Sequence, residues 1–191
     1  LAEPVINNCT EPLDVDSIMQ VVNALAPGNH AAKASIDIAL HDLYGKLEGK
    51  PLWEIWGIDP EKTPCTSYTI GYDANDSIVL VKVREADWAK ILKVKLGRGE
   101  AEDKRMITLI RSLSDKPIYV DANQGWPTKE HALMMCQWLA EQGVVMIEQP
   151  MPKHMDEEHA WLCERVDLPI LADEACQTYD DVERLAPYYD G

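Results

Sequence analysis

The sequence predicts an α/β fold with parallel strands, preceded by a short helical region. From about residue 64, five short apolar runs alternate with five helical patterns, and the cycle repeats about every 26 residues. The runs are mostly apolar, as expected of strands buried on both faces of a parallel sheet. Before residue 64 the apolar residues recur instead at helical spacing.

Two helices are expected in the first region, at 13–26 and 30–48. In the second helix, apolar residues recur at steps of three or four positions, which predicts one buried face: Ala32, Ile36, Ala39, Leu40, Leu43 and Leu47. Gly49 and Pro51 are typical residues for its end. A short helical stretch at 53–56 closes the region.

The expected strands of the second region cover 66–71, 91–96, 117–121, 144–148 and 169–173. The expected helices cover 75–89, 101–114, 128–142, 155–166 and 178–187. Thr128 is a suitable first cap for its helix, and Gly143 a suitable stop.

These units predict a partial TIM-type (β/α) barrel of about five βα units at 63–191, preceded by a helical domain at 1–62. Eight cycles would need about 210 residues, and only about 128 follow position 63. A doubly wound five-strand sheet would fit the length. That fold would be expected to carry a glycine-rich phosphate loop after its first strand, and the sequence has none there.

Composition disfavours several classes of protein. The formal net charge is −15, which disfavours binding to nucleic acid or to an anionic membrane surface. No apolar run approaches the roughly 20 residues of a membrane span, and residues 1–10 show no export signal. Five widely spaced cysteines without a C-x-x-C pair indicate reduced thiols in a cytoplasmic protein: Cys9, Cys65, Cys136, Cys163 and Cys176. The five histidines show no metal-ligand spacing and are expected on helices or in the loops before them.

Charged residues at the ends of four expected strands predict the chemistry. Lys95, Asp121, Glu148 and Asp173 follow one another at separations of 26, 27 and 25 residues, each one strand–helix unit. In a parallel barrel this spacing places all four side chains on the C-terminal rim, where barrel active sites lie.

The three carboxylates predict a site for a hard cation. A single acidic residue at a strand end is commonly a helix cap or a solvated loop residue. Three such residues on consecutive strands would repel one another unless a cation lay between them. Oxygen ligands without histidine or cysteine favour Mg²⁺, with Mn²⁺ as the alternative.

Lys93 and Lys95 are expected to share one face of their strand, since residues two apart point to the same side. A free lysine has a pKa of about 10.4, which makes it a poor base at neutral pH. A second ammonium group and a metal ion nearby would lower that pKa toward about 7–8. Lysine and a divalent metal together suit removal of a proton alpha to a carboxylate.

Four motifs give the chain a resemblance to a known family: KVK at 93–95, DANQGW at 121–126, IEQP at 147–150 and LADE at 171–174. Together they resemble the muconate-lactonizing subgroup of the enolase superfamily. The stretches IDIALHDL at 36–43 and TSYTIG at 66–71 resemble the dipeptide epimerases within that subgroup. The similarity extends over nearly the whole chain, with the motifs in order and at the expected spacing.

The resemblance implies a role for each matched position. Asp121, Glu148 and Asp173 would bind Mg²⁺, Lys95 would be one of two catalytic lysines with Lys93 as its electrostatic neighbour, and Thr69 would lie near the substrate. Residues 1–62 would be the C-terminal part of a capping domain. The second catalytic lysine is expected at about 195–198, beyond Gly191. Together with the initial Leu1, this predicts a fragment that lacks both ends of the parent protein and is inactive alone.

The implied function is an Mg²⁺-dependent isomerase, an epimerase or racemase that removes an alpha proton from a dipeptide such as Ala-Glu through an enediolate. The alternatives within the superfamily are o-succinylbenzoate synthase, muconate cycloisomerase and N-acylamino-acid racemase, because they share the metal ligands and Lys95. The expected partner is a small molecule, a dipeptide or N-acyl amino acid, and a homo-oligomer is compatible with the sequence. A hypothesis of another class is an inactive remnant that binds metal or oligomerises, with exposed sheet edges that limit its solubility.

Overall fold

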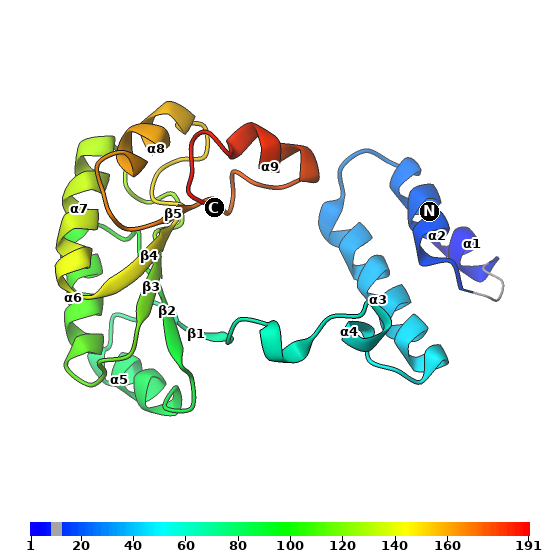
Figure 1. Cartoon of the computed structure of the whole chain (residues 1–191), viewed down its shortest axis with the longest axis horizontal. Helices are drawn as coiled ribbons and strands as arrows, with labels where there is room; N and C mark the ends of the chain where they lie inside the picture. Colours follow the sequence, from blue (N-terminus) through cyan, green and yellow to red (C-terminus); the bar gives the residue numbers. More distant parts are fainter. Residues whose placement is uncertain (9–12) are drawn as a thin grey trace. The chain divides into compact units, whose positions relative to one another are not determined.

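The computed structural model of the protein describes residues 1–8 and 13–191, so Cys9 lies outside the described residues. The chain divides into two compact units, Leu1–Pro64 and Cys65–Gly191 (Figure 1). The described part of the first unit is helical, with α1 (Glu3–Asn7), α2 (Val15–Ala24), α3 (His30–Glu48), α4 (Leu52–Ile55) and a 3₁₀ turn at Pro60–Lys62.

Local capping explains where the helices of the first unit begin and end. The Asp14 carboxylate accepts a hydrogen bond of 3.0 Å from the backbone N–H of Ser17 at the start of α2. Gly49 follows α3 in the left-handed conformation, with φ of 65°, and so ends the helix where the sequence indicated.

The predicted buried face of α3 is only partly correct. Leu40 is buried and Ile36 is half-buried, but the remaining apolar positions of that face are exposed, among them Leu43 and Leu47. Among the described elements of its unit, α3 packs mainly against α2 and α4, and these two short helices cover only part of its apolar surface.

The second unit is a five-stranded parallel sheet in which the strands lie in chain order. They are β1 (Ser67–Ile70), β2 (Ile91–Lys95), β3 (Ile118–Asp121), β4 (Val144–Glu148) and β5 (Ile170–Leu171). The helices are α5 (Asp76–Glu85), α6 (Glu100–Arg111), α7 (Lys129–Glu141), α8 (Asp156–Cys163) and α9 (Tyr179–Leu185).

The arrangement is that of a partial TIM-type barrel. Each strand pairs with the next one along the chain, and α5 to α8 all lie on the same side of the sheet (Figure 1). A doubly wound sheet would reverse its strand order and carry helices on both faces, so this alternative is wrong. The predicted elements are all present, with β5 as the main difference in length: it has two residues where five were expected.

The core lies between the sheet and these helices. Leu92 and Val94 of β2 are fully buried, as are Ile118 and Val120 of β3. The alternating burial along β2 leaves Lys93 and Lys95 on the opposite face, away from the helices. The fold therefore separates an apolar helix-side face from a charged face at the end of the strands.

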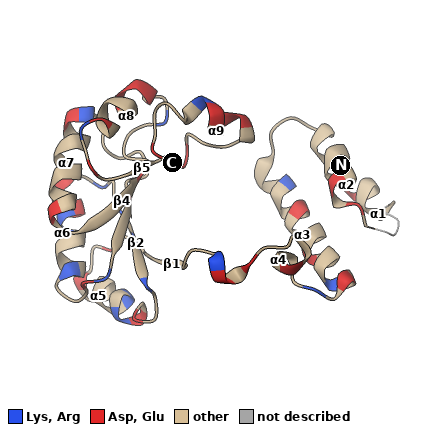
Figure 2. Ribbon diagram, in the orientation of Figure 1, with Lys and Arg blue, Asp and Glu red and all other residues tan. Residues whose placement is uncertain are grey.

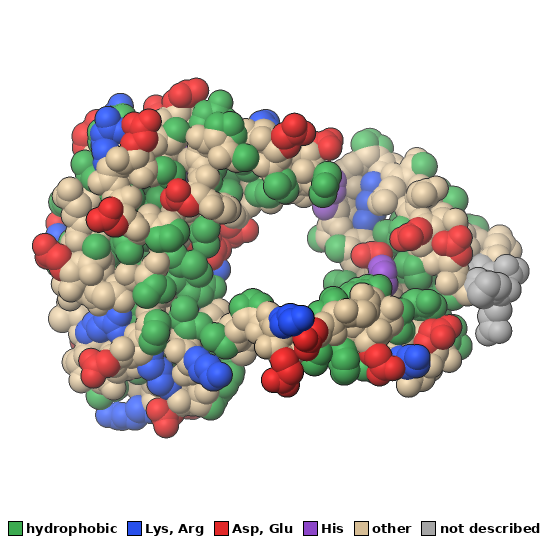
Figure 3. All heavy atoms as spheres, in the orientation of Figure 1, with side chains coloured by type: hydrophobic (Ala, Val, Ile, Leu, Met, Phe, Trp, Pro, Cys, Tyr) green, Lys and Arg blue, Asp and Glu red, His purple; other side chains and the backbone are tan. Residues whose placement is uncertain are grey.

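Surface charges of both signs are spread over the helices of the second unit (Figure 2). The face in view in Figure 3 likewise shows acidic and basic side chains interspersed with hydrophobic ones. Within the described residues, no helix is long and apolar enough to cross a membrane. The four cysteines that the structure describes are free thiols: Cys65, Cys136, Cys163 and Cys176.

Candidate active site

The parallel register brings three of the four predicted strand-end charges to one rim of the sheet. Lys95 pairs with Asp121, and Asp121 pairs with Glu148. Asp173 departs from the prediction: Glu148 pairs with Leu171, so Asp173 lies two residues beyond the end of β5. Beyond Leu171 the ladder with β4 does not continue, because the N–H of Asp173 donates to the side-chain oxygen of Gln149 and the backbone carbonyl of Gln149 accepts from Gln124.

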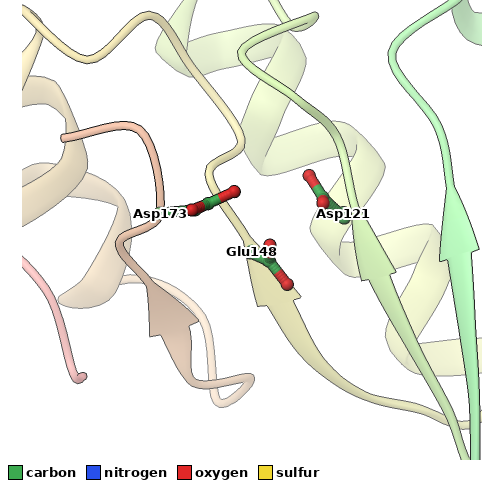
Figure 4. A group of neighbouring side chains, drawn as sticks. All are labelled: Asp121, Glu148 and Asp173. Carbon is green, nitrogen blue, oxygen red and sulfur yellow. The ribbon is translucent and has the colours of Figure 1, made fainter. Parts of the chain in front are cut away.

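The carboxylates of Asp121, Glu148 and Asp173 nevertheless converge. Each offers an oxygen, and these three atoms all lie within 4.8 Å of one another. Figure 4 shows Asp121 and Asp173 on either side of Glu148, with each side chain coming from a different strand or strand end. Asp121 is buried, Glu148 half-buried and Asp173 exposed, so the group is reached by solvent mainly at Asp173.

Both lysines of β2 form ion pairs with this cluster. Lys93 Nζ lies 2.7 and 2.6 Å from the two oxygens of Glu148 and 3.0 Å from an oxygen of Asp121. Lys95 donates a short hydrogen bond to Asp121. The Lys93 side chain is 16% exposed and that of Lys95 35%, so Lys95 is the more accessible of the two.

The ion pairs and burial shift the pKa values of Lys93, Asp121 and Glu148. Burial lowers the pKa of Lys93, but its hydrogen bonds to Glu148 and Asp121 more than offset this and hold the pKa above the usual range. Burial raises the pKa of Asp121, and the hydrogen bonds from Lys95 and Lys93 bring it below its usual value. Burial, together with the nearby Asp121, raises the pKa of Glu148 even though Lys93 acts to lower it.

Thr69 lies beside this cluster on the first strand. It pairs with Lys93 in the β1–β2 register, and its side chain is exposed. Because paired residues of neighbouring parallel strands point to the same face, Thr69 shares the face of the two lysines.

Two glycines allow close contact between the loops that follow β2 and β3. A Cβ atom on Gly97 would lie 2.1 Å from the carbonyl oxygen of Ala122, and one on Gly125 would lie 2.3 Å from Gly97 Cα. Any side chain at either position would push the loops apart. The close approach therefore fixes the strand end that carries Lys95 against the one that carries Asp121.

Asp103 on α6 is a residue that sequence reasoning missed. It is 1% exposed, and its carboxylate accepts hydrogen bonds from the N–H groups of Gly97 and Arg98, at 3.1 and 3.0 Å, and from Trp126 Nε1 at 3.0 Å. In the sequence it looks like an ordinary acidic residue in the first turn of a helix. The available signal was its position four residues after Gly99, where a loop from a strand turns into a helix.

Comparison with known families decides the relationship. Residues 79–187 match the family described as "Enolase C-terminal domain-like", and residues 1–57 match the "Mandelate racemase / muconate lactonizing enzyme, N-terminal domain". The chain belongs to the enolase superfamily.

Curated members of the superfamily include close relatives of this chain. An L-Ala-D/L-Glu epimerase of Bacteroides thetaiotaomicron is 50% identical over 95% of the chain and 47% of its own length. Muconate cycloisomerase 1 of Pseudomonas putida is 31% identical over 91% of the chain and 47% of its own length. The chain thus spans about half the length of the curated relatives it matches.

A solved superfamily structure has the same fold. The dipeptide epimerase from Cytophaga hutchinsonii, complexed with Mg and the dipeptide D-Ala-L-Val, matches with a TM-score of 0.77 and 29% identity. The match covers 93% of this chain and 49% of that structure.

Proposed function

We propose that the gene product containing this chain is a dipeptide epimerase that acts at the carbon alpha to a carboxylate, in a substrate such as Ala-Glu. The single observation that carries the proposal is the position of Lys95. It is a partly exposed amine on the rim of the sheet, in contact with one member of a group of three convergent carboxylates. The relative with 50% identity, an L-Ala-D/L-Glu epimerase, supports the choice of substrate.

The carboxylate group fits Mg²⁺ as the cofactor. Its three donors are oxygen atoms within 4.8 Å of one another, which suits a small hard cation, and neither histidine nor cysteine belongs to the group. We therefore assign Asp121, Glu148 and Asp173 as its ligands. Bound there, Mg²⁺ would hold the substrate carboxylate and stabilise the negative charge that develops on it.

The two lysines take different roles in this proposal. Lys95 is the base, because it is accessible and lies on the rim where the substrate would bind. It would remove the alpha proton from one face of the substrate and leave an enediolate. Lys93 is more enclosed and is held protonated by Glu148 and Asp121, so we assign it an electrostatic role. Thr69, on the same face, would contact the substrate.

Inversion at the alpha carbon needs a second group, an acid that returns a proton to the opposite face of the substrate. We place that group, a second lysine, outside the 191 residues. We likewise propose that residues 1–62 are the C-terminal part of a capping domain and that 63–191 form the first five βα units of the barrel. The activity accordingly belongs to the complete gene product.

Cycloisomerisation is the second candidate, since muconate cycloisomerase 1 is also a relative. Its identity to the chain is 31%, against 50% for the L-Ala-D/L-Glu epimerase, and this difference favours the epimerase.

A product assay separates the two candidates. The complete gene product would be incubated with Mg²⁺ and L-Ala-L-Glu, and the diastereomers separated chromatographically, with muconate tested in parallel. We expect L-Ala-D-Glu to form and muconate to remain unchanged. Turnover of muconate without formation of any dipeptide epimer would overturn the proposal in favour of cycloisomerisation.

A further inference from the structure

Gln149 is a fully buried polar residue directly after the predicted ligand Glu148. Its backbone has a φ of 37°, in the left-handed region that residues other than glycine seldom adopt. Such a strained backbone conformation persists only where the surrounding structure fixes it. The contacts of Gln149 show what fixes it.

The side-chain oxygen of Gln149 holds the loop that carries Asp173. It accepts hydrogen bonds from the backbone N–H groups of Asp173, at 3.0 Å, and Ala175, at 3.1 Å. Because β5 ends at Leu171, the ladder of the sheet does not reach Asp173. Beyond the last hydrogen bond of the ladder, the Gln149 side chain therefore holds the backbone of Asp173 and Ala175 in place.

The side-chain nitrogen of Gln149 points the other way, into a buried polar group. It donates to Met151 O at 3.2 Å and to the hydroxyl of Tyr189 at 3.1 Å. His159 completes the group: its Nε2 accepts from the N–H of Met151 at 3.4 Å, and its ring lies 4.5 Å from that of Tyr189. Two N–H donors on one side and a carbonyl acceptor on the other leave the amide a single orientation.

The backbone of Gln149 joins the neighbouring strand ends. Its N–H donates to Leu171 O, and its carbonyl accepts from the N–H of Gln124, each at 2.8 Å. Gln124 lies in the loop that follows Asp121. One residue thus contacts the loops of two predicted ligands and is covalently bonded to the third, Glu148.

We propose that Gln149 is a positioning residue that sets the separation of the three carboxylates before a cation binds. The inference rests on the proposed Mg²⁺ site. Residues that hydrogen-bond to ligand-bearing segments typically change metal affinity about 10- to 100-fold when they are replaced. A purely structural residue would change stability and leave the affinity of the folded protein unchanged.

The test compares cation affinity in variants of the complete gene product, with Mn²⁺ as a spectroscopic probe and Mg²⁺ measured by calorimetry. Gln149→Met keeps the volume and removes both hydrogen-bonding ends. Gln149→Asn tolerates a positive φ but is one methylene too short to reach the Asp173 loop. Met135→Ala, at a fully buried position on α7, is the control for lost stability.

We expect about a tenfold or greater rise in the dissociation constant for Gln149→Met, a rise for Gln149→Asn, and none for Met135→Ala. In metal-free protein, amide hydrogen exchange in residues 172–176 should increase in both Gln149 variants and stay as in the wild type in Met135→Ala.

Two failures can be told apart. Wild-type protein that binds neither cation would overturn the metal site and this inference together. Wild-type binding with equal affinity in folded Gln149→Met or Gln149→Asn would overturn the inference alone. If Gln149→Met does not fold, Gln149→Asn and the exchange measurement decide.

Discussion

Lys93 reaches across β3 to Glu148, so that its ammonium nitrogen lies 2.7 Å from one carboxylate oxygen and 2.6 Å from the other. The same nitrogen lies 3.0 Å from Asp121. The chain therefore places one of its own cations between two carboxylates that would otherwise repel each other. This explains how strands with acidic ends can lie side by side in the sheet.

Replacing Lys93 with methionine should destabilise the metal-free protein. Removing one member of a buried ion pair costs about 3–5 kcal/mol, and the partial exposure here reduces our expectation to about 2–4 kcal/mol. Urea unfolding in the presence of a chelator measures the loss. Lys153→Met, at an exposed position, is the control and should change the free energy of unfolding by less than about 0.5 kcal/mol. Equal stability of the two variants would contradict the role given to Lys93.

Magnesium should stabilise the protein, because a cation that binds the folded state alone shifts the unfolding equilibrium. At a Mg²⁺ concentration of about 100 times the dissociation constant, the free energy of unfolding rises by about 2.7 kcal/mol. Thermal unfolding with Mg²⁺ and with a chelator measures the difference. Asp121→Asn should abolish most of it, whereas Asp167→Asn, at an exposed position, should retain it. The same stabilisation in both variants would place the cation elsewhere.

Stability should fall in mildly acidic solution because of His159. Burial is the main reason that its pKa lies below the ordinary 6.5, although the nearby Asp156 and Glu158 act to raise it. The unfolded state then binds the proton of His159 more tightly than the folded state does. The contribution of neutral, buried His159 to the free energy of unfolding is therefore complete above about pH 6.5 and is lost as the pH falls below that value.

The free energy of unfolding cannot change by more than about 1.4 kcal/mol per pH unit when one proton is bound. Urea unfolding between pH 7.5 and 5 measures this change, and His159→Gln should flatten the profile. Parallel wild-type and variant profiles would assign the acid sensitivity to other groups.

Asp103→Asn should destabilise the junction of the loops after β2 and β3. Asparagine has one side-chain oxygen, so it leaves at least one N–H donor of Gly97, Arg98 or Trp126 without its acceptor. Such a loss costs about 1–3 kcal/mol. Denaturant unfolding measures the change, and Trp126 fluorescence should report altered packing around the indole. Wild-type stability in this variant would mean that the buried carboxylate holds neither loop.

The register of the site could be predicted from sequence in large part. Lys95, Asp121 and Glu148 occupy paired positions because each strand–helix unit has nearly constant length, and constant length produces constant register. Asp173 shows the limit of that reasoning. Its strand ends early, and a side chain from a neighbouring strand end holds the loop instead, which spacing alone cannot show.

Buried polar residues were the least predictable part of the site. Gln149 lies inside the IEQP motif at 147–150 and Asp103 in an acidic first turn, yet neither position shows in sequence that the side chain is enclosed. Hydrophobic spacing predicts which apolar residues are buried only where a partner element covers them. The partly exposed face of α3 shows the same limit, because two short helices cannot cover Leu43 and Leu47.

The central claim is that Lys95 removes the alpha proton of a dipeptide, and deuterium incorporation tests it most directly. The complete gene product would be incubated in D₂O with Mg²⁺ and L-Ala-L-Glu, and exchange at the alpha carbon of the glutamate followed by NMR. We predict exchange that requires Mg²⁺, falls at least about 100-fold in Lys95→Ala, and persists in Lys153→Ala. Exchange that continues undiminished in Lys95→Ala, or that never occurs in the wild type, would contradict the claim.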